Sequence, residues 1–117
     1  MLESQSVKFL EGIKMSNVTV YFLNSRDSFQ FYISKDKRKL VSEFQDSGEY
    51  SPDWTFERNG HPDESICEYV FDVTNNPCRQ DEREAVYGRG RSLSVGDIVS
   101  VNGNAYLCDS MGWLKVS

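Results

Sequence analysis

The sequence has no long apolar run. No stretch approaches the ~20 apolar residues that a membrane-spanning helix needs. The first 14 residues also lack the basic start and apolar centre of a signal peptide, because Glu3, Lys8, Glu11 and Lys14 interrupt them. We therefore expect no membrane partner and no export by that route.

Cysteine and histidine are scarce, with three cysteines and one histidine in 117 residues. An odd and sparse set of cysteines does not suit a disulfide framework, so we expect a reducing, cytoplasmic location. Cys67, Cys78 and Cys108 contain no Cys-x-x-Cys pair of the kind that structural zinc sites use. His61 precedes Cys67 by six residues, which matches no common arrangement of a base and a nucleophile. We predict no metal, no cofactor and no enzymatic activity.

Charge is uneven along the chain, although the net value is only −5. Residues 43–72 contain nine acidic residues and one basic residue, Arg58. Residues 1–42 contain seven basic and four acidic residues, and residues 73–117 contain five of each. An acidic middle repels the phosphate backbone, so a nucleic-acid partner is disfavoured.

The length fits one globular domain, which we place at residues 15–117. Residues 1–14 form either a leader or an N-terminal helix, since Met15 could itself be a start. Residues 17–23 and 28–34 are rich in β-branched and aromatic residues and predict a hairpin. Residues 39–45 fit a short helix or no regular element, and residues 54–57 fit a short strand.

Residues 61–75 carry the best helical pattern in the chain. Ile66, Tyr69, Val70 and Val73 recur at the spacing of one helical face, and Pro62 suits the first turn. Residues 79–91 have little apolar content and predict a long loop.

The C-terminal part predicts a β-meander with strands at 98–101, 104–108 and 113–116. Asn102-Gly103 is the pair that a tight hairpin turn prefers, because both turn positions need a positive φ. The fold class we predict is α+β, with a mostly antiparallel sheet of about five or six strands and one main amphipathic helix.

The segment from Arg91 to Val99 reads RSLSVGDIV, and Asn102-Gly103, Tyr106, Asp109-Ser110 and Gly112-Trp113 follow it. Together with Thr74-Asn75-Asn76-Pro77, this pattern resembles the C-terminal signature of YodL-like domains, over roughly residues 64–116. The resemblance implies an origin in a mobile genetic element, such as a phage or plasmid, and a non-catalytic role. The residues themselves indicate fold-making roles, with Asp97 bonded to nearby backbone amides in a turn.

Two surfaces are candidates for binding. Glu64, Glu68 and Asp72 repeat at i, i+4 on the predicted helix and form an acidic ridge. The ridge is either a solvated face or a surface that suits a basic protein partner of unknown identity or mimics nucleic-acid phosphate. The alternative is a weak nucleic-acid site in the loop at 79–91, built from Tyr87, Arg89 and Arg91. Four aromatic residues could also line a groove for a peptide or ligand, although such residues more often belong to the core or its edge: Tyr50, Trp54, Phe56 and Trp113.

Overall fold

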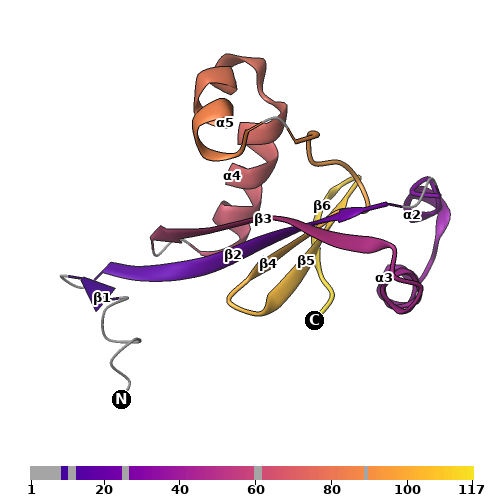
Figure 1. The fold of residues 1–117 in the computed structure, drawn as a ribbon. Coiled ribbons are helices and arrows are strands. Elements are labelled where there is room, and N and C mark those ends of the chain that lie inside the picture. Colours follow the sequence, from indigo (N-terminus) through magenta and orange to yellow (C-terminus); the bar gives the residue numbers. More distant parts are fainter. Residues whose placement is uncertain (1–8, 11–12, 25–26, 60–61, 89) are drawn as a thin grey trace.

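The chain folds around an antiparallel sheet with helices on both of its faces (Figure 1). The computed structural model describes residues 9–10, 13–24, 27–59, 62–88 and 90–117, and side chains from Met15 onward. The α+β fold class and the antiparallel sheet that the sequence predicts are confirmed.

Strand β2 (Ile13–Leu23) is the centre of the sheet. It pairs with β3 (Tyr50–Asn59) on one side and with β4 (Ile98–Val101) on the other. Strands β5 (Asn104–Asp109) and β6 (Gly112–Lys115) continue the sheet beyond β4, and β1 (Phe9–Leu10) pairs with the start of β2. Strands β3 and β6 therefore form the two edges of the main part of the sheet.

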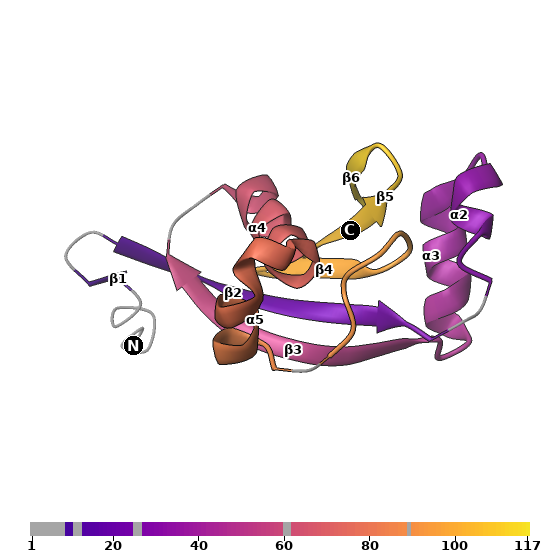
Figure 2. The ribbon, with the colours of Figure 1, turned by 90° about the horizontal axis from the view of Figure 1, so that it is seen from above.

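Helix α4 (Asp63–Asn75) packs on one face of the sheet and confirms the predicted amphipathic helix (Figure 2). Its apolar stripe meets the side chains that β2 and β4 direct to that face. The best-buried members of this core are Val18, Val20, Ile66, Val70, Val73, Val99 and Val101.

Helices α2 (Gln30–Ile33) and α3 (Lys37–Asp46) lie at one end of the opposite face. The predicted strand at 28–34 is wrong. Its alternating Phe29, Phe31 and Ile33 suit a half-buried strand, but only Phe31 is buried, against Phe44 at 5.8 Å between ring centroids. Strand β2 instead finds its partners far along the chain, and α3 resolves the ambiguous segment at 39–45 as a helix.

The predicted long loop at 79–91 is also wrong. A 3-10 turn, η1 (Pro77–Arg79), leads into helix α5 (Gln80–Val86). No residue of α5 is buried, so the apolar spacing that normally reveals a helix is missing. Asp81 and Glu82 in its first turn favour the helix electrostatically.

The C-terminal meander is confirmed as β4, β5 and β6. Asn102 and Gly103 have φ of 52° and 88°, as the predicted hairpin turn requires. Of the predicted leader or helix at 1–14, residues 1–8 and 11–12 lie outside the described part, and the remainder is strand. Within the described ranges, no helix is long and apolar enough to cross a bilayer.

Candidate protein-binding surface

The three residues of the predicted acidic ridge all lie on α4 but differ in their contacts. Asp72 accepts a hydrogen bond from Arg79 Nη1 at 2.5 Å and another from Asn76 at 3.1 Å, and these contacts lower the pKa of its carboxyl. Asp72 is therefore part of the junction between α4 and α5. Glu64 and Glu68 remain exposed, and neither forms an ion pair with another described residue.

A groove runs beside these two glutamates, between α4 and the turn that joins β5 to β6. Its volume is ≈ 530 Å³, which is of the order of a small-ligand pocket. We call it the acidic groove, and it is lined by Glu64, Ser65, Glu68, Met111, Gly112 and Trp113. The Trp113 indole donates a hydrogen bond to Glu68 Oε2 at 3.1 Å, and Met111 is 94% exposed. The groove thus combines two carboxylates that form no ion pair with another described residue and accessible apolar surface.

A second hollow, of ≈ 190 Å³, adjoins the groove and shares Glu68, Gly112 and Trp113 with it. Phe71 of α4, which is 40% exposed, lines it together with Asp109 and Ser110. The sequence did not place Phe71 or Met111 in any site. Trp113 was identified as a candidate groove residue, but without its neighbour Glu68.

Two of the three predicted nucleic-acid-binding residues, Tyr87 and Arg91, make their contacts within the fold. The Tyr87 ring packs on Trp54, with 4.7 Å between centroids, and its hydroxyl donates to the Arg91 carbonyl at 2.7 Å. Burial raises the pKa of Tyr87 to about 12, and the nearby Asp53 adds to the shift. Arg91 binds Asp97 through both of its Nη atoms. Arg89 lies outside the described residues.

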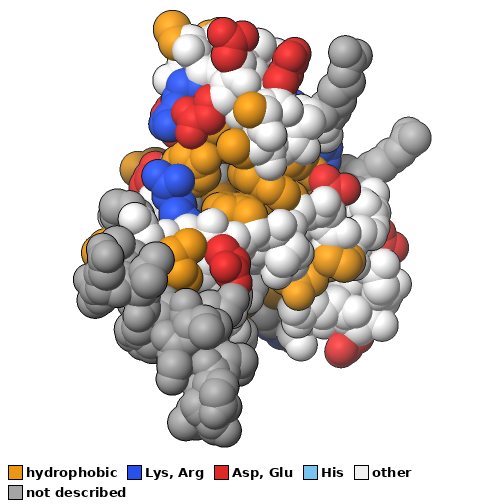
Figure 3. Space-filling view, turned by 60° about the vertical axis from the view of Figure 1, so that its left-hand side comes forward, with side chains coloured by type: hydrophobic (Ala, Val, Ile, Leu, Met, Phe, Trp, Pro, Cys, Tyr) orange, Lys and Arg blue, Asp and Glu red, His pale blue; other side chains and the backbone are white. Residues whose placement is uncertain are grey.

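The aromatic residues that could have lined one groove lie in separate places. Trp54 and Phe56 of β3 stack with 4.3 Å between ring centroids, and Phe56 also meets Tyr69 of α4. Figure 3 shows hydrophobic side chains gathered on this face of the molecule, with basic and acidic side chains around them. Arg58 stacks on Tyr69, with 3.6 Å between its Cζ atom and the ring centroid. The side chains of this cluster therefore pack against one another within the fold.

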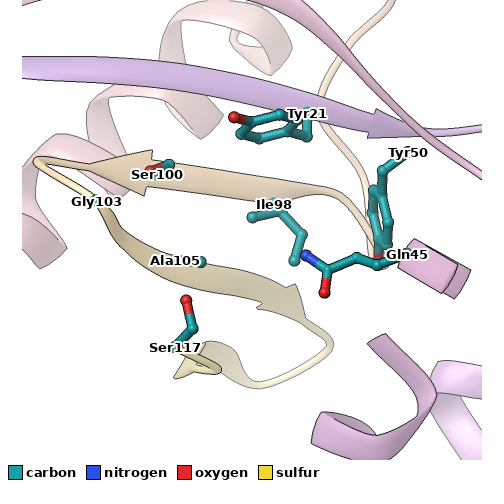
Figure 4. Close-up of a pocket in the computed structure, with 8 residues that line it drawn as sticks. All are labelled: Tyr21, Gln45, Tyr50, Ile98, Ser100, Gly103, Ala105 and Ser117. Carbon is teal, nitrogen blue, oxygen red and sulfur yellow. The ribbon is translucent and has the colours of Figure 1, made fainter. Parts of the chain in front are cut away.

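Another hollow, of ≈ 510 Å³, lies on the opposite face of the sheet, beside the end of α3 (Figure 4). Its lining residues include Tyr21, Gln45, Ser100 and Tyr50. The Tyr50 hydroxyl donates to the Gly96 carbonyl at 2.6 Å, and burial raises the pKa of Tyr50. The described residues that line this hollow include no Asp, Glu, Lys, Arg or His side chain.

The thiols have the properties of packing residues. Cys67 and Cys108 are buried, and burial raises the pKa of each to about 12, which suppresses the thiolate that a nucleophile needs. Cys78 is exposed, and His61 is outside the described residues. Among the described residues, no three His, Cys, Asp or Glu side chains cluster as metal ligands would.

The two parts of the signature that suggests a YodL-like domain contact each other. Asn75 donates through Nδ2 to the Leu93 carbonyl at 3.0 Å, and Thr74 Oγ1 accepts from the Leu93 amide at 3.1 Å. Asp97 accepts from the Ser94 amide at 2.8 Å, as the sequence predicts for a turn. The signature therefore fastens the end of α4 to the segment that enters β4.

Comparison with protein-family models, with curated proteins and with solved structures gives no significant match to this chain. The resemblance to YodL-like domains thus stays a prediction from the sequence.

Proposed function

We propose that this chain is a small non-catalytic interaction protein, and that it binds or modulates a protein partner through the acidic groove. The observation that carries the proposal is the position of Glu64 and Glu68. Both are exposed without an ion pair among the described residues, and both line a groove that also presents Met111 and Trp113. Exposed apolar surface beside unpaired charge is typical of protein-binding sites.

The chemistry of the groove favours a basic segment of a protein. Carboxylates attract lysine and arginine side chains and repel phosphates. Trp113 and Met111 supply the apolar contact that commonly anchors a protein interface. The groove therefore fits a protein surface that presents a cation next to an apolar side chain.

The alternative, a nucleic-acid site at Tyr87, Arg89 and Arg91, has less support. Tyr87 and Arg91 are held by Trp54 and Asp97, so neither presents a free ring face or a free guanidinium. A base or a phosphate would have to displace these contacts. The net charge of −5 opposes such binding further.

The cellular setting in this proposal comes from the sequence. The YodL-like resemblance suggests an accessory protein of a mobile genetic element. The free thiols of Cys67, Cys78 and Cys108 suit a cytoplasmic location. The partner is then a protein of the host cell or of the element.

Capture from nuclease-treated lysate of the source cells, with tagged variants, tests the proposal. A specific partner should bind the wild-type chain and should be lost with Glu64→Lys/Glu68→Lys. Glu43→Lys/Asp46→Lys is the matched control, because it reverses two exposed charges on α3 and leaves the groove intact. Equal capture by both double variants would reject the acidic groove. Capture that nuclease abolishes would favour the nucleic-acid alternative.

A further inference from the structure

The hollow beside the end of α3 shares no described lining residue with the acidic groove (Figure 4). Its volume of ≈ 510 Å³ is of the order of a small-ligand site. Ile98 of β4 and Ala105 of β5 give it apolar surface, and Tyr21 of β2 and Tyr50 of β3 add two aromatic rings. These residues belong to the core cluster under α2 and α3, which is separate from the cluster under α4. We call this site the neutral hollow.

The neutral hollow presents polar side chains that the fold leaves unused. Four of them form no hydrogen bond with another described residue: Tyr21, Gln45, Ser100 and Ser117. Tyr50 differs, because its hydroxyl donates to the Gly96 carbonyl at 2.6 Å. In Figure 4 the Gln45 amide extends from the end of α3 toward the side chain of Ile98. Three hydroxyl groups and one amide are therefore available to a ligand.

The chemistry of the lining excludes two classes of ligand. Among the described residues that line the neutral hollow there is no charged side chain. A charged ligand would lose water there without meeting an opposite charge, so nucleotides, sugar phosphates and metal ions fit poorly. A purely apolar ligand would displace water from the four polar side chains without replacing its hydrogen bonds. The neutral hollow therefore suits an uncharged ligand that has both an apolar face and many hydrogen-bonding groups.

We propose that the neutral hollow binds an uncharged sugar unit. Serine and tyrosine hydroxyls and the glutamine amide can each donate and accept hydrogen bonds. They therefore match sugar hydroxyls, which also do both. One face of a sugar ring consists of C–H groups and can pack on the ring of Tyr21. A planar base matches less well, because each position on its edge is fixed as a donor or an acceptor. This inference goes beyond the proposed function, since it uses no residue of the acidic groove.

Amide NMR spectra of the purified, isotopically labelled chain test the proposal during titration with uncharged sugars. The probes are the methyl glycosides of glucose, galactose, mannose and N-acetylglucosamine. At least one of them should give saturable shifts at Gln45, Ser100 and Ala105. The dissociation constant should be in the millimolar range, as suits a ligand with so few atoms.

Two conservative variants locate the binding site. Gln45→Ala and Tyr21→Phe should each weaken binding about fivefold, because each removes one hydrogen-bonding group. Gln80→Ala is the matched control, since it removes an exposed glutamine from α5, outside the neutral hollow, and should leave the affinity unchanged. The same spectra show whether each variant is folded.

Four results would overturn the sugar site. The first is the absence of a saturable shift with any of the four glycosides. The second is a set of shifts that lies outside the neutral hollow. The third is an equal effect of Gln45→Ala and Gln80→Ala on the affinity. The fourth is binding of adenine where no glycoside binds, which would assign the hollow to a base.

The two sites fail independently. A chain that binds no glycoside but captures a protein in a manner dependent on Glu68 would reject the sugar site and leave the proposed function in place. Glycoside binding without such capture would retain the neutral hollow and reject the acidic groove.

Discussion

The Arg91 guanidinium grips the Asp97 carboxylate with two hydrogen bonds, at 2.8 Å from Nη1 and 2.7 Å from Nη2. Asp97 is fully buried, and it also accepts from the backbone amides of Leu23 and Ser94. One carboxylate therefore ties the end of β2 to the turn that enters β4. The acidic groove depends on this frame indirectly, because β4 carries the β5–β6 hairpin.

Replacing Asp97 by asparagine should destabilise the fold by about 3 kcal/mol, because it removes the charge that satisfies Arg91 and weakens two backbone hydrogen bonds. The free energy of unfolding in urea measures the effect. Asp46→Asn, an exposed carboxylate at the end of α3, is the control and should change stability by less than about 0.5 kcal/mol. Similar losses from both variants would contradict the structural role of Asp97.

Gly96→Ala should be more destabilising than Gly48→Ala. Both glycines have positive φ, of 102° and 73°, so alanine is strained at either position by about 1–2 kcal/mol. Only at Gly96 would a Cβ meet neighbours, at 3.0 Å from Leu23 and 3.2 Å from Phe31. Thermal unfolding of the two variants gives the comparison. Equal shifts in Tm would show that the space around Gly96 is looser than the contacts indicate.

The three thiols should differ in reactivity. Cys78 is exposed and should react with a thiol reagent at pH 8 within the mixing time or shortly after it, whereas Cys67 and Cys108 should react only when the chain unfolds. Absorbance from an aromatic disulfide reagent counts the groups, with and without urea. Rapid modification of more than one thiol in the native chain would contradict the burial of Cys67 and Cys108.

Stability should fall at alkaline pH. The pKa of Cys67 and of Cys108 rises from 9.0 to about 12 on folding, so between these values the unfolded chain releases protons that the folded chain retains. The free energy of unfolding should be independent of these thiols below pH 9 and should decrease as the pH rises from 9 toward 12. Urea midpoints at several pH values measure the slope. Cys67→Ala/Cys108→Ala should have a shallower slope, and an unchanged slope would exclude the thiols as its cause.

The sequence predicted those elements whose signal is local. Ile66, Val70 and Val73 marked α4 by their spacing, and Asn102-Gly103 marked the turn between β4 and β5. The prediction of a strand at 28–34 was wrong because an alternating pattern reports only side-chain type. The partner strands of β2 lie far away in the chain. Helix α5 was not predicted because it buries no residue whose spacing could mark a helical face.

The sequence predicted only part of the candidate site. Helical spacing placed Glu64 and Glu68 on one face of α4. The ion pair that removes Asp72 from this set depends on the reversal of the chain between α4 and α5. Trp113 reaches Glu68 across 45 residues of sequence, a contact that only the folded sheet creates. Local patterns contain no information on such pairings.

A photoreactive phenylalanine analogue at Met111 tests the central claim, that the acidic groove is where this chain meets a protein. Met111 lines the groove, and Tyr32 on α2 is a control position that is exposed but distant from it in the sequence and on another element. Irradiation in nuclease-treated lysate of the source cells should give discrete protein adducts from position 111 and none from position 32. Adducts from position 32 alone, or from neither position, would contradict the account.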